Sequence, residues 1–192
     1  MIDSQPRPYN RKPRPNWMFS LSVGLNIIGI LGLLIAWWTV SEKQHSDHAL
    51  KKLYFEFCVN KVQVYRNKDE QGKAEKVCKD IWDASLASNV SPFLFAKVVA
   101  VESAFQCDAY SHAGAFGCAQ VLVRTWTPHH PDLISQRGNL FAGAAILRGY
   151  IDQFGDEGLG LLAYNRGPGP VTAALRAGEN PSNGYDRKVL GV

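Results

Sequence analysis

The stretch from Trp17 to Trp38 contains no charged side chain, and this feature constrains the fold of the chain most strongly. With a rise of about 1.5 Å per residue, a helix of that length is just long enough to cross a hydrocarbon core of about 30 Å. Trp17, Trp37 and Trp38 lie at its two ends, where aromatic residues anchor a helix at the membrane surface. We therefore expect a transmembrane helix over residues 17–40.

Two other interpretations of this stretch are a buried core helix and a cleaved signal peptide. A core helix seldom runs this far without a charge, and a signal peptide has a shorter apolar region followed by a small-residue cleavage site, which Ala36-Trp37-Trp38 does not provide. Residues 1–16 hold four basic residues and one acidic residue, whereas the segment after the helix is mixed in charge. This asymmetry predicts a cytoplasmic N-terminus and a periplasmic body, in a single-pass protein of the inner membrane or of a virion membrane.

The formal net charge of +4 comes largely from that N-terminal tail. The remaining residues carry 17 basic and 16 acidic side chains in total, so the body of the chain is nearly neutral. A protein that binds nucleic acid needs a basic face toward the phosphates. We therefore expect no nucleic-acid partner.

All four cysteines follow the predicted membrane helix, and an exported body is exposed to oxidising conditions. We favour the disulfides Cys107–Cys118 and Cys58–Cys78, because each pair flanks a turn-rich stretch; other pairings or small buried thiols are the alternatives. No CxxC motif occurs, and the histidines do not have the spacing of ligands. We therefore expect no metal site.

Residues 41–74 are polar with interspersed apolar side chains, and we interpret them as a helical, membrane-proximal spacer. Beyond it, apolar residues recur at helical spacing. Ser91 and Pro92 supply an N-cap and a first-turn proline, which predicts a helix from there to about Ala104. Glu102 then lies in the last turn beside apolar residues, where desolvation raises the pKa of a carboxyl group, as a general acid requires.

Glu102 also opens a series of short motifs. Glu102-Ser103-Ala104-Phe105 is followed by the pattern A-x-S-x-x-G-A-x-G-x-x-Q over residues 109–120, by Thr125, and by A-Y-N-x-G-P-G-x-V over residues 163–171. Tyr185, Lys188 and Val189 end the series as Y-x-x-K-V. In order and spacing this series resembles the signature of the soluble lytic transglycosylase (SLT) family over about residues 75–190.

The resemblance implies a mainly α, lysozyme-like catalytic domain, similar to goose-type lysozyme, over residues 75–192. The predicted organisation is then a basic cytoplasmic tail (1–16), a transmembrane signal anchor (17–40), a spacer (41–74) and this domain. By the same resemblance Glu102 is the catalytic residue. The positions that match substrate-binding residues of the family are Ser111, Gln120, Leu122, Thr125, Tyr164, Asn165 and Tyr185.

The activity implied is cleavage of the β-1,4 bond between N-acetylmuramic acid and N-acetylglucosamine in peptidoglycan, with a 1,6-anhydro ring as product and no cofactor. Most glycosidases use two carboxylates, but the nearest second acid, Asp108, has the character of a turn residue. The alternatives are a hydrolytic muramidase of the same fold and a non-catalytic, peptidoglycan-binding membrane or virion protein. The sequence does not choose among phage lysis, penetration of the wall by a phage, a secretion system and wall remodelling.

Overall fold

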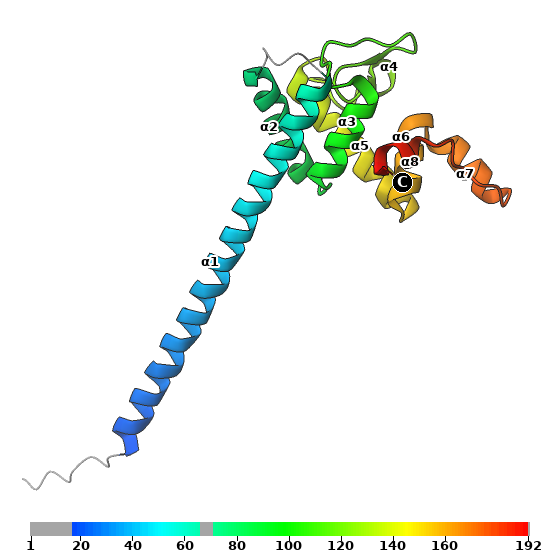
Figure 1. The fold of residues 1–192 in the computed structure, drawn as a ribbon. Helices are drawn as coiled ribbons and strands as arrows, with labels where there is room; N and C mark the ends of the chain where they lie inside the picture. Colours follow the sequence, from blue (N-terminus) through cyan, green and yellow to red (C-terminus); the bar gives the residue numbers. More distant parts are fainter. Residues whose placement is uncertain (1–16, 66–70, 192) are drawn as a thin grey trace, which may run out of the picture. The chain divides into compact units, whose positions relative to one another are not determined.

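The computed structural model describes residues 17–65 and 71–191 (Figure 1). The side chains of residues 17–30 and Gln71 lie outside this description. The predicted cytoplasmic tail lies outside the described residues. The described chain is mainly helical, as expected, with one two-stranded antiparallel sheet. The elements are α1 (Trp17–Tyr65), α2 (Gln71–Ala87), α3 (Pro92–Ser103), β1 (Ala115–Phe116), β2 (Val121–Leu122), α4 (Val123–Trp126), α5 (Gln136–Phe154), α6 (Glu157–Arg166), α7 (Pro168–Arg176) and α8 (Tyr185–Leu190).

The chain divides into two compact units, residues 1–50 and residues 51–192. In the first unit the described part is the beginning of α1, whose side chains from Leu31 to Leu50 are almost all exposed. Within the part of the chain that the structure describes, no helix is both long and apolar enough to span a membrane. The structure therefore does not support the transmembrane helix predicted over residues 17–40, of which residues 17–30 have no described side chains.

In the second unit, the end of α1 packs against α2. Tyr54, Cys58 and Val62 are spaced four residues apart, so they lie on one face of the helix, and all three are buried. The Tyr54 hydroxyl donates a hydrogen bond to the carbonyl oxygen of Cys78 (3.0 Å), and Cys58 forms the predicted disulfide with Cys78. The segment predicted as a spacer is thus helical up to Tyr65 and contributes to the core, while the domain boundary at residue 75 stays a prediction.

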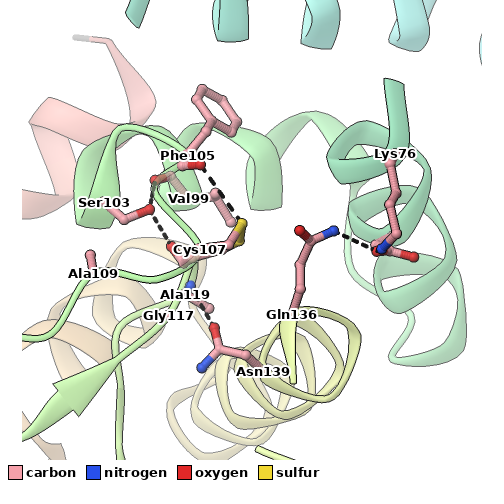
Figure 2. The surroundings of a disulfide bond; sticks show 12 residues. Lys76, Val99, Ser103, Phe105, Cys107, Ala109, Gly117, Ala119, Gln136 and Asn139 are labelled. Atoms are coloured by element: carbon pink, nitrogen blue, oxygen red, sulfur yellow. Dashed lines mark hydrogen bonds and ion pairs between the residues drawn. A yellow bond between two sulfur atoms is a disulfide. The ribbon is translucent and has the colours of Figure 1, made fainter. Parts of the chain in front are cut away.

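Helix α5 lies against α2 and α6 and carries Leu140, Ala144 and Leu147 into the core. The buried carboxylate of Asp80 on α2 joins α2 to α5 by accepting hydrogen bonds from Gln136 (2.7 Å) and Arg137 (3.1 Å) at the start of α5. It also accepts one from Lys76 (3.0 Å) of α2, and Figure 2 shows Lys76 and Gln136. Burial by itself would raise the pKa of Asp80, but these three hydrogen bonds and the positive charge of Lys76 together outweigh it and hold that pKa below its usual value.

The boundaries of α3 follow from local chemistry. The side chain of Ser91 caps the helix by accepting from the amide of Leu94 (3.5 Å), and Pro92 occupies the first turn, as predicted. The helix ends where Ala104 and Phe105 both adopt positive φ angles of 52° and 62°. This conformation is unfavourable for residues other than glycine, so it requires surrounding structure to hold it. Phe105 is fully buried, and its packing supplies that support.

Candidate active site

Glu102 lies in the last turn of α3, next to the buried residues Val98 and Val99. Its side chain is only partly accessible to solvent. Burial raises the pKa of Glu102 above the usual value of a glutamate, whereas a hydrogen bond from Tyr185 and the positive charge of Lys188 act in the opposite direction without cancelling it. The carboxyl group therefore stays protonated at a higher pH than an exposed glutamate.

The two residues that oppose this shift share one face of α8. The hydroxyl of Tyr185 donates a hydrogen bond to Oε1 of Glu102. Lys188 follows three residues later, which places it on the same side of the helix. Burial and the nearby carboxylate raise the pKa of the Tyr185 hydroxyl well above its usual value, so it remains a hydrogen-bond donor.

A loop and the hairpin β1–β2 are fastened to the end of α3. Ser103 donates from its hydroxyl to the carbonyl oxygen of Cys118 (2.7 Å), and Cys118 forms the predicted disulfide with Cys107 (Figure 2). The end of α3 is therefore joined to the hairpin in two ways. Ser103, next to Glu102, forms a hydrogen bond with Cys118, and the loop that follows Ser103 is linked to Cys118 by the disulfide from Cys107.

Asn139 of α5 supports the same hairpin from below the loop (Figure 2). Its buried side chain accepts a hydrogen bond from the amide of Ala119 (2.8 Å) and donates one to the carbonyl oxygen of Phe116 (2.7 Å). Gly117 adopts a φ of +80°, and a Cβ atom there would lie 2.5 Å from Cγ of Asn139. Only glycine meets both requirements, which accounts for this position of the motif.

Gln120 takes a positive φ of 47° at the turn between the strands. Its side-chain amide donates to the carbonyl oxygens of Gly117 (2.9 Å) and Ala109 (3.3 Å), so the side chain is held in place without a substrate. Gln120 and Glu102 together line a cavity of about 500 Å³, the first cavity. Its other lining residues are Tyr65, Ala100, Val101, Ser103, Ala104, Gln106, Ala109, Tyr110 and Lys188.

Four other predicted binding residues line a second cavity, of about 350 Å³, in which Gln120 also takes part. They are Leu122, Thr125, Tyr164 and Asn165. The hydroxyl of Tyr164 donates to the carbonyl oxygen of Ala119 (2.7 Å). Because Gln120 is common to both cavities, the two adjoin at the hairpin turn, with Glu102 in one and Tyr164 in the other.

Ser111 and Tyr185 are the two predicted binding residues that line neither of these cavities, but Tyr185 bonds to Glu102 and Ser111 does not. The hydroxyl of Ser111 accepts a hydrogen bond from the amide of Ala115 (3.0 Å), and its own amide donates to the carbonyl oxygen of Ala115 (2.8 Å). In this structure Ser111 thus holds the glycine-containing turn before β1.

Several cavity residues were not among the sequence-based candidates. Tyr65 and Tyr110 line the first cavity with Lys188, and Trp126 and Tyr150 line the second. Lys188 had a signal in the sequence, the i, i+3 spacing from Tyr185, but Tyr65 had none because it lies outside the motifs. In the described part of the chain, no three His, Cys, Asp or Glu side chains are grouped so as to bind a metal ion.

The described domain is mainly helical, and one partly buried carboxyl group ends α3 beside a short hairpin, which is the arrangement that the motifs predicted. The transglycosylase SLT domain family matches residues 81–184, which is more than half of the chain. The chain therefore belongs to this family, as the motifs predicted.

Three individual proteins are similar to parts of this chain. A protein of Enterobacteria phage PRD1, described as "Transglycosylase", is 35% identical over 85 residues, which cover 44% of this chain and 32% of the phage protein. The 70 kDa soluble lytic transglycosylase of Escherichia coli has a similar fold, with a TM-score of 0.52 and 17% identity over 73% of this chain and 29% of that one. A lytic transglycosylase Slt of Pseudomonas aeruginosa, in an inactive mutant form, gives a TM-score of 0.48 and 23% identity over 58% of this chain and 22% of that one. This chain thus spans about a third or less of the length of each.

Proposed function

We propose that this protein is a lytic transglycosylase that cleaves the β-1,4 bond between N-acetylmuramic acid and N-acetylglucosamine in peptidoglycan. The observation that carries the proposal is Glu102, a partly buried carboxyl group with a raised pKa, which lines a cavity and receives a hydrogen bond from Tyr185. Membership of the SLT family and the match to the phage protein support the same activity.

In the first step, Glu102 donates its proton to the oxygen that bridges the two sugars, and the bond from C1 of the muramoyl residue to that oxygen breaks. The raised pKa keeps part of the Glu102 population protonated nearer neutral pH, where a general acid is most effective. The carbonyl oxygen of the substrate's own acetamido group stabilises C1 as the leaving sugar departs.

In the second step, the Glu102 carboxylate accepts the proton of the muramoyl 6-hydroxyl group, and O6 bonds to C1. A 1,6-anhydro ring results, the acetamido group is released, and Glu102 is again protonated. No water is consumed. Holding the 6-hydroxyl next to C1 favours ring closure over attack by solvent through proximity.

The choice of transglycosylation over hydrolysis is supported by the carboxylates near the site. Glu102 is the one acidic residue among the described residues that line either cavity. Asp108, the nearest acid in the sequence, is exposed and lines neither cavity. A hydrolytic enzyme of the two-carboxylate type needs a second acid that activates water or attacks the sugar.

The test is mass spectrometry of the muropeptides released from purified sacculi by the full-length chain, beside Glu102→Gln. We expect products lighter than hydrated sugars by one water, about 18 mass units, because no water enters the displacement. They should be absent with Glu102→Gln. Hydrated reducing ends would instead identify a muramidase, and wall binding without release by either protein would identify a non-catalytic binding role.

We further propose that residues 17–40 anchor the protein in a membrane, with the N-terminus in the cytoplasm and the catalytic domain in the periplasm. The uncharged sequence, the basic residues before it and the two disulfides in the body of the chain support this. Among the described side chains, Leu33 (73%) and Trp37 (70%) are highly exposed, as lipid-facing residues would be. Recovery of the chain in a soluble fraction after lysis of a bacterial host, rather than with carbonate-washed membranes, would overturn this proposal.

For the biological setting, we propose local degradation of the wall in phage lysis or wall penetration. The match to a protein of phage PRD1 favours this setting over a secretion system or ordinary wall remodelling. Induced expression of the full chain in a bacterial host should cause lysis, and expression of Glu102→Gln should not.

A further inference from the structure

Tyr65, the last residue of α1, lines the first cavity together with Glu102, although it lies outside the residues that the SLT family matches. Half of its surface (50%) is exposed. Tyr110, in the loop before β1, lines the same cavity and is 69% exposed. Two large aromatic side chains from separate parts of the chain therefore remain accessible beside the candidate acid.

The position of Tyr65 is fixed without a ligand. Its ring centre lies 6.1 Å from that of Phe105, with the ring planes at 55°. Two turns earlier, the Cys58–Cys78 disulfide holds α1 against α2. The contact with Phe105 covers only part of the Tyr65 side chain, half of which stays exposed. The exposed part is available to a ligand.

We propose that Tyr65 and Tyr110 form an aromatic wall that binds a pyranose ring of the glycan next to Glu102. The face of an aromatic ring carries a negative partial charge, and the C–H groups on one face of a pyranose carry a positive one, so the two surfaces attract while excluding water. Polar side chains of the same cavity, Gln106, Gln120 and Lys188, are available for the hydroxyl and acyl groups at the edge of the sugar.

This inference rests on the proposed function, because it assigns part of the same glycan site. Its consequence is that α1 is more than a connection to the N-terminal part of the chain. The end of this helix completes the binding site, so glycan affinity depends on a residue that is not among the motifs of the family domain.

The experiment measures binding in the absence of turnover. Full-length Glu102→Gln is titrated by calorimetry with a tetrasaccharide of alternating N-acetylglucosamine and N-acetylmuramic acid. Adding Tyr65→Ala should weaken binding about three- to tenfold, the range of a single aromatic contact. Tyr65→Phe should bind as the parent does, because the ring and not the hydroxyl group makes the contact.

Val64→Ala is the matched control, since Val64 is 79% exposed and does not line the cavity. Tyr110→Ala tests the other side of the wall on a different segment, so the inference does not depend on the folding of one variant. Thermal unfolding of each variant identifies any loss of structure.

Equal affinities of Tyr65→Ala, Tyr110→Ala and the parent would overturn the inference while leaving the proposed function in place. Failure of the parent itself to bind the tetrasaccharide would overturn both. Weaker binding of the tetrasaccharide by Tyr65→Ala and Tyr110→Ala, with Val64→Ala unchanged, would establish the aromatic wall. This result would hold whether the enzyme cleaves the bond by transglycosylation or by hydrolysis.

Discussion

The hydroxyl of Tyr185 donates a hydrogen bond to Oε1 of Glu102, and so joins α8 to the end of α3 across 83 residues of sequence. This hydrogen bond orients the carboxyl group without placing a second full charge against it. It also favours the ionised form, which burial opposes, and burial has the larger effect on the pKa. Glu102 is therefore oriented by a neutral donor while its pKa stays above the usual value, which suits a group that acts first as an acid and then as a base.

Replacing Tyr185 by phenylalanine should separate these effects. Without the hydrogen bond the pKa of Glu102 should rise further, so the alkaline limb of the pH–rate profile should move to higher pH. The maximal rate of solubilisation of sacculi should fall about 10- to 100-fold, since a hydrogen bond to a charged group is lost. The rate is measured across the pH range by the decrease in turbidity.

Arg187→Ala is the control for Tyr185→Phe, because Arg187 is exposed on the same helix and lines neither cavity. It should leave both rate and profile unchanged. If Tyr185→Phe lowered the rate but left the alkaline limb in place, Tyr185 would position Glu102 without affecting its ionisation.

Glu102→Gln should make the protein more stable at neutral pH while removing activity. A carboxyl group whose pKa is higher in the folded than in the unfolded state contributes stability below its unfolded pKa, and this contribution is lost as the pH rises through the folded pKa. Glutamine does not titrate, and its carbonyl oxygen can still accept from Tyr185. We expect a gain of about 1 kcal/mol in the free energy of unfolding at pH 7, which disappears below about pH 4.

Urea denaturation of the two proteins at several pH values measures this difference. A gain that stays constant from pH 4 to pH 8 would show that it comes from packing and not from the ionisation of Glu102.

Local signals in the sequence were enough to predict α3 and the place of Glu102 in its last turn. The N-cap of Ser91 and the turn preference of Pro92 act within a few residues, so they determine the start of the helix wherever it lies in the fold. The positions that line the cavities with Glu102 were identified instead through their resemblance to the family, and seven of the eight predicted site residues do line a cavity or bond to Glu102. Ser111 was not separable from them, because a serine that closes a turn and a serine that binds sugar have the same sequence context.

What the sequence did not predict depends on distant packing. The hairpin β1–β2 has strands of two residues each, too short for any alternation of apolar residues, and Asn139 of α5 bonds to its backbone. Tyr65 reaches the cavity because a disulfide and a buried tyrosine hold α1 against α2. The disulfide itself was predicted, but neither the bonds of Asn139 to the hairpin nor the approach of Tyr65 to the cavity has a pattern that can be read along the chain.

Asn139→Leu should therefore destabilise the protein although the two side chains are similar in size, because the variant loses both hydrogen bonds to the hairpin. The variant leaves the Ala119 amide and the Phe116 carbonyl oxygen without their side-chain partner in a buried position, and we expect a loss of about 2–4 kcal/mol in the free energy of unfolding. Chemical denaturation measures this loss, with Gln153→Ala, exposed on the same helix, as control. A loss below that of an ordinary surface substitution would mean that water replaces both hydrogen bonds.

Removing the Cys58–Cys78 disulfide with two alanines should affect stability and glycan binding together. The bridge closes a loop with a sequence separation of 20, so its loss should lower the free energy of unfolding by about 3 kcal/mol. If the disulfide holds Tyr65 in the aromatic wall, the tetrasaccharide should also bind more weakly, and adding Tyr65→Ala should then have little further effect. Both affinities are measured in the Glu102→Gln background under conditions where the variant remains folded. Full additivity of the two changes would instead show that the packing of Tyr54 and Val62 positions α1 without the disulfide, and that the covalent bond serves stability alone.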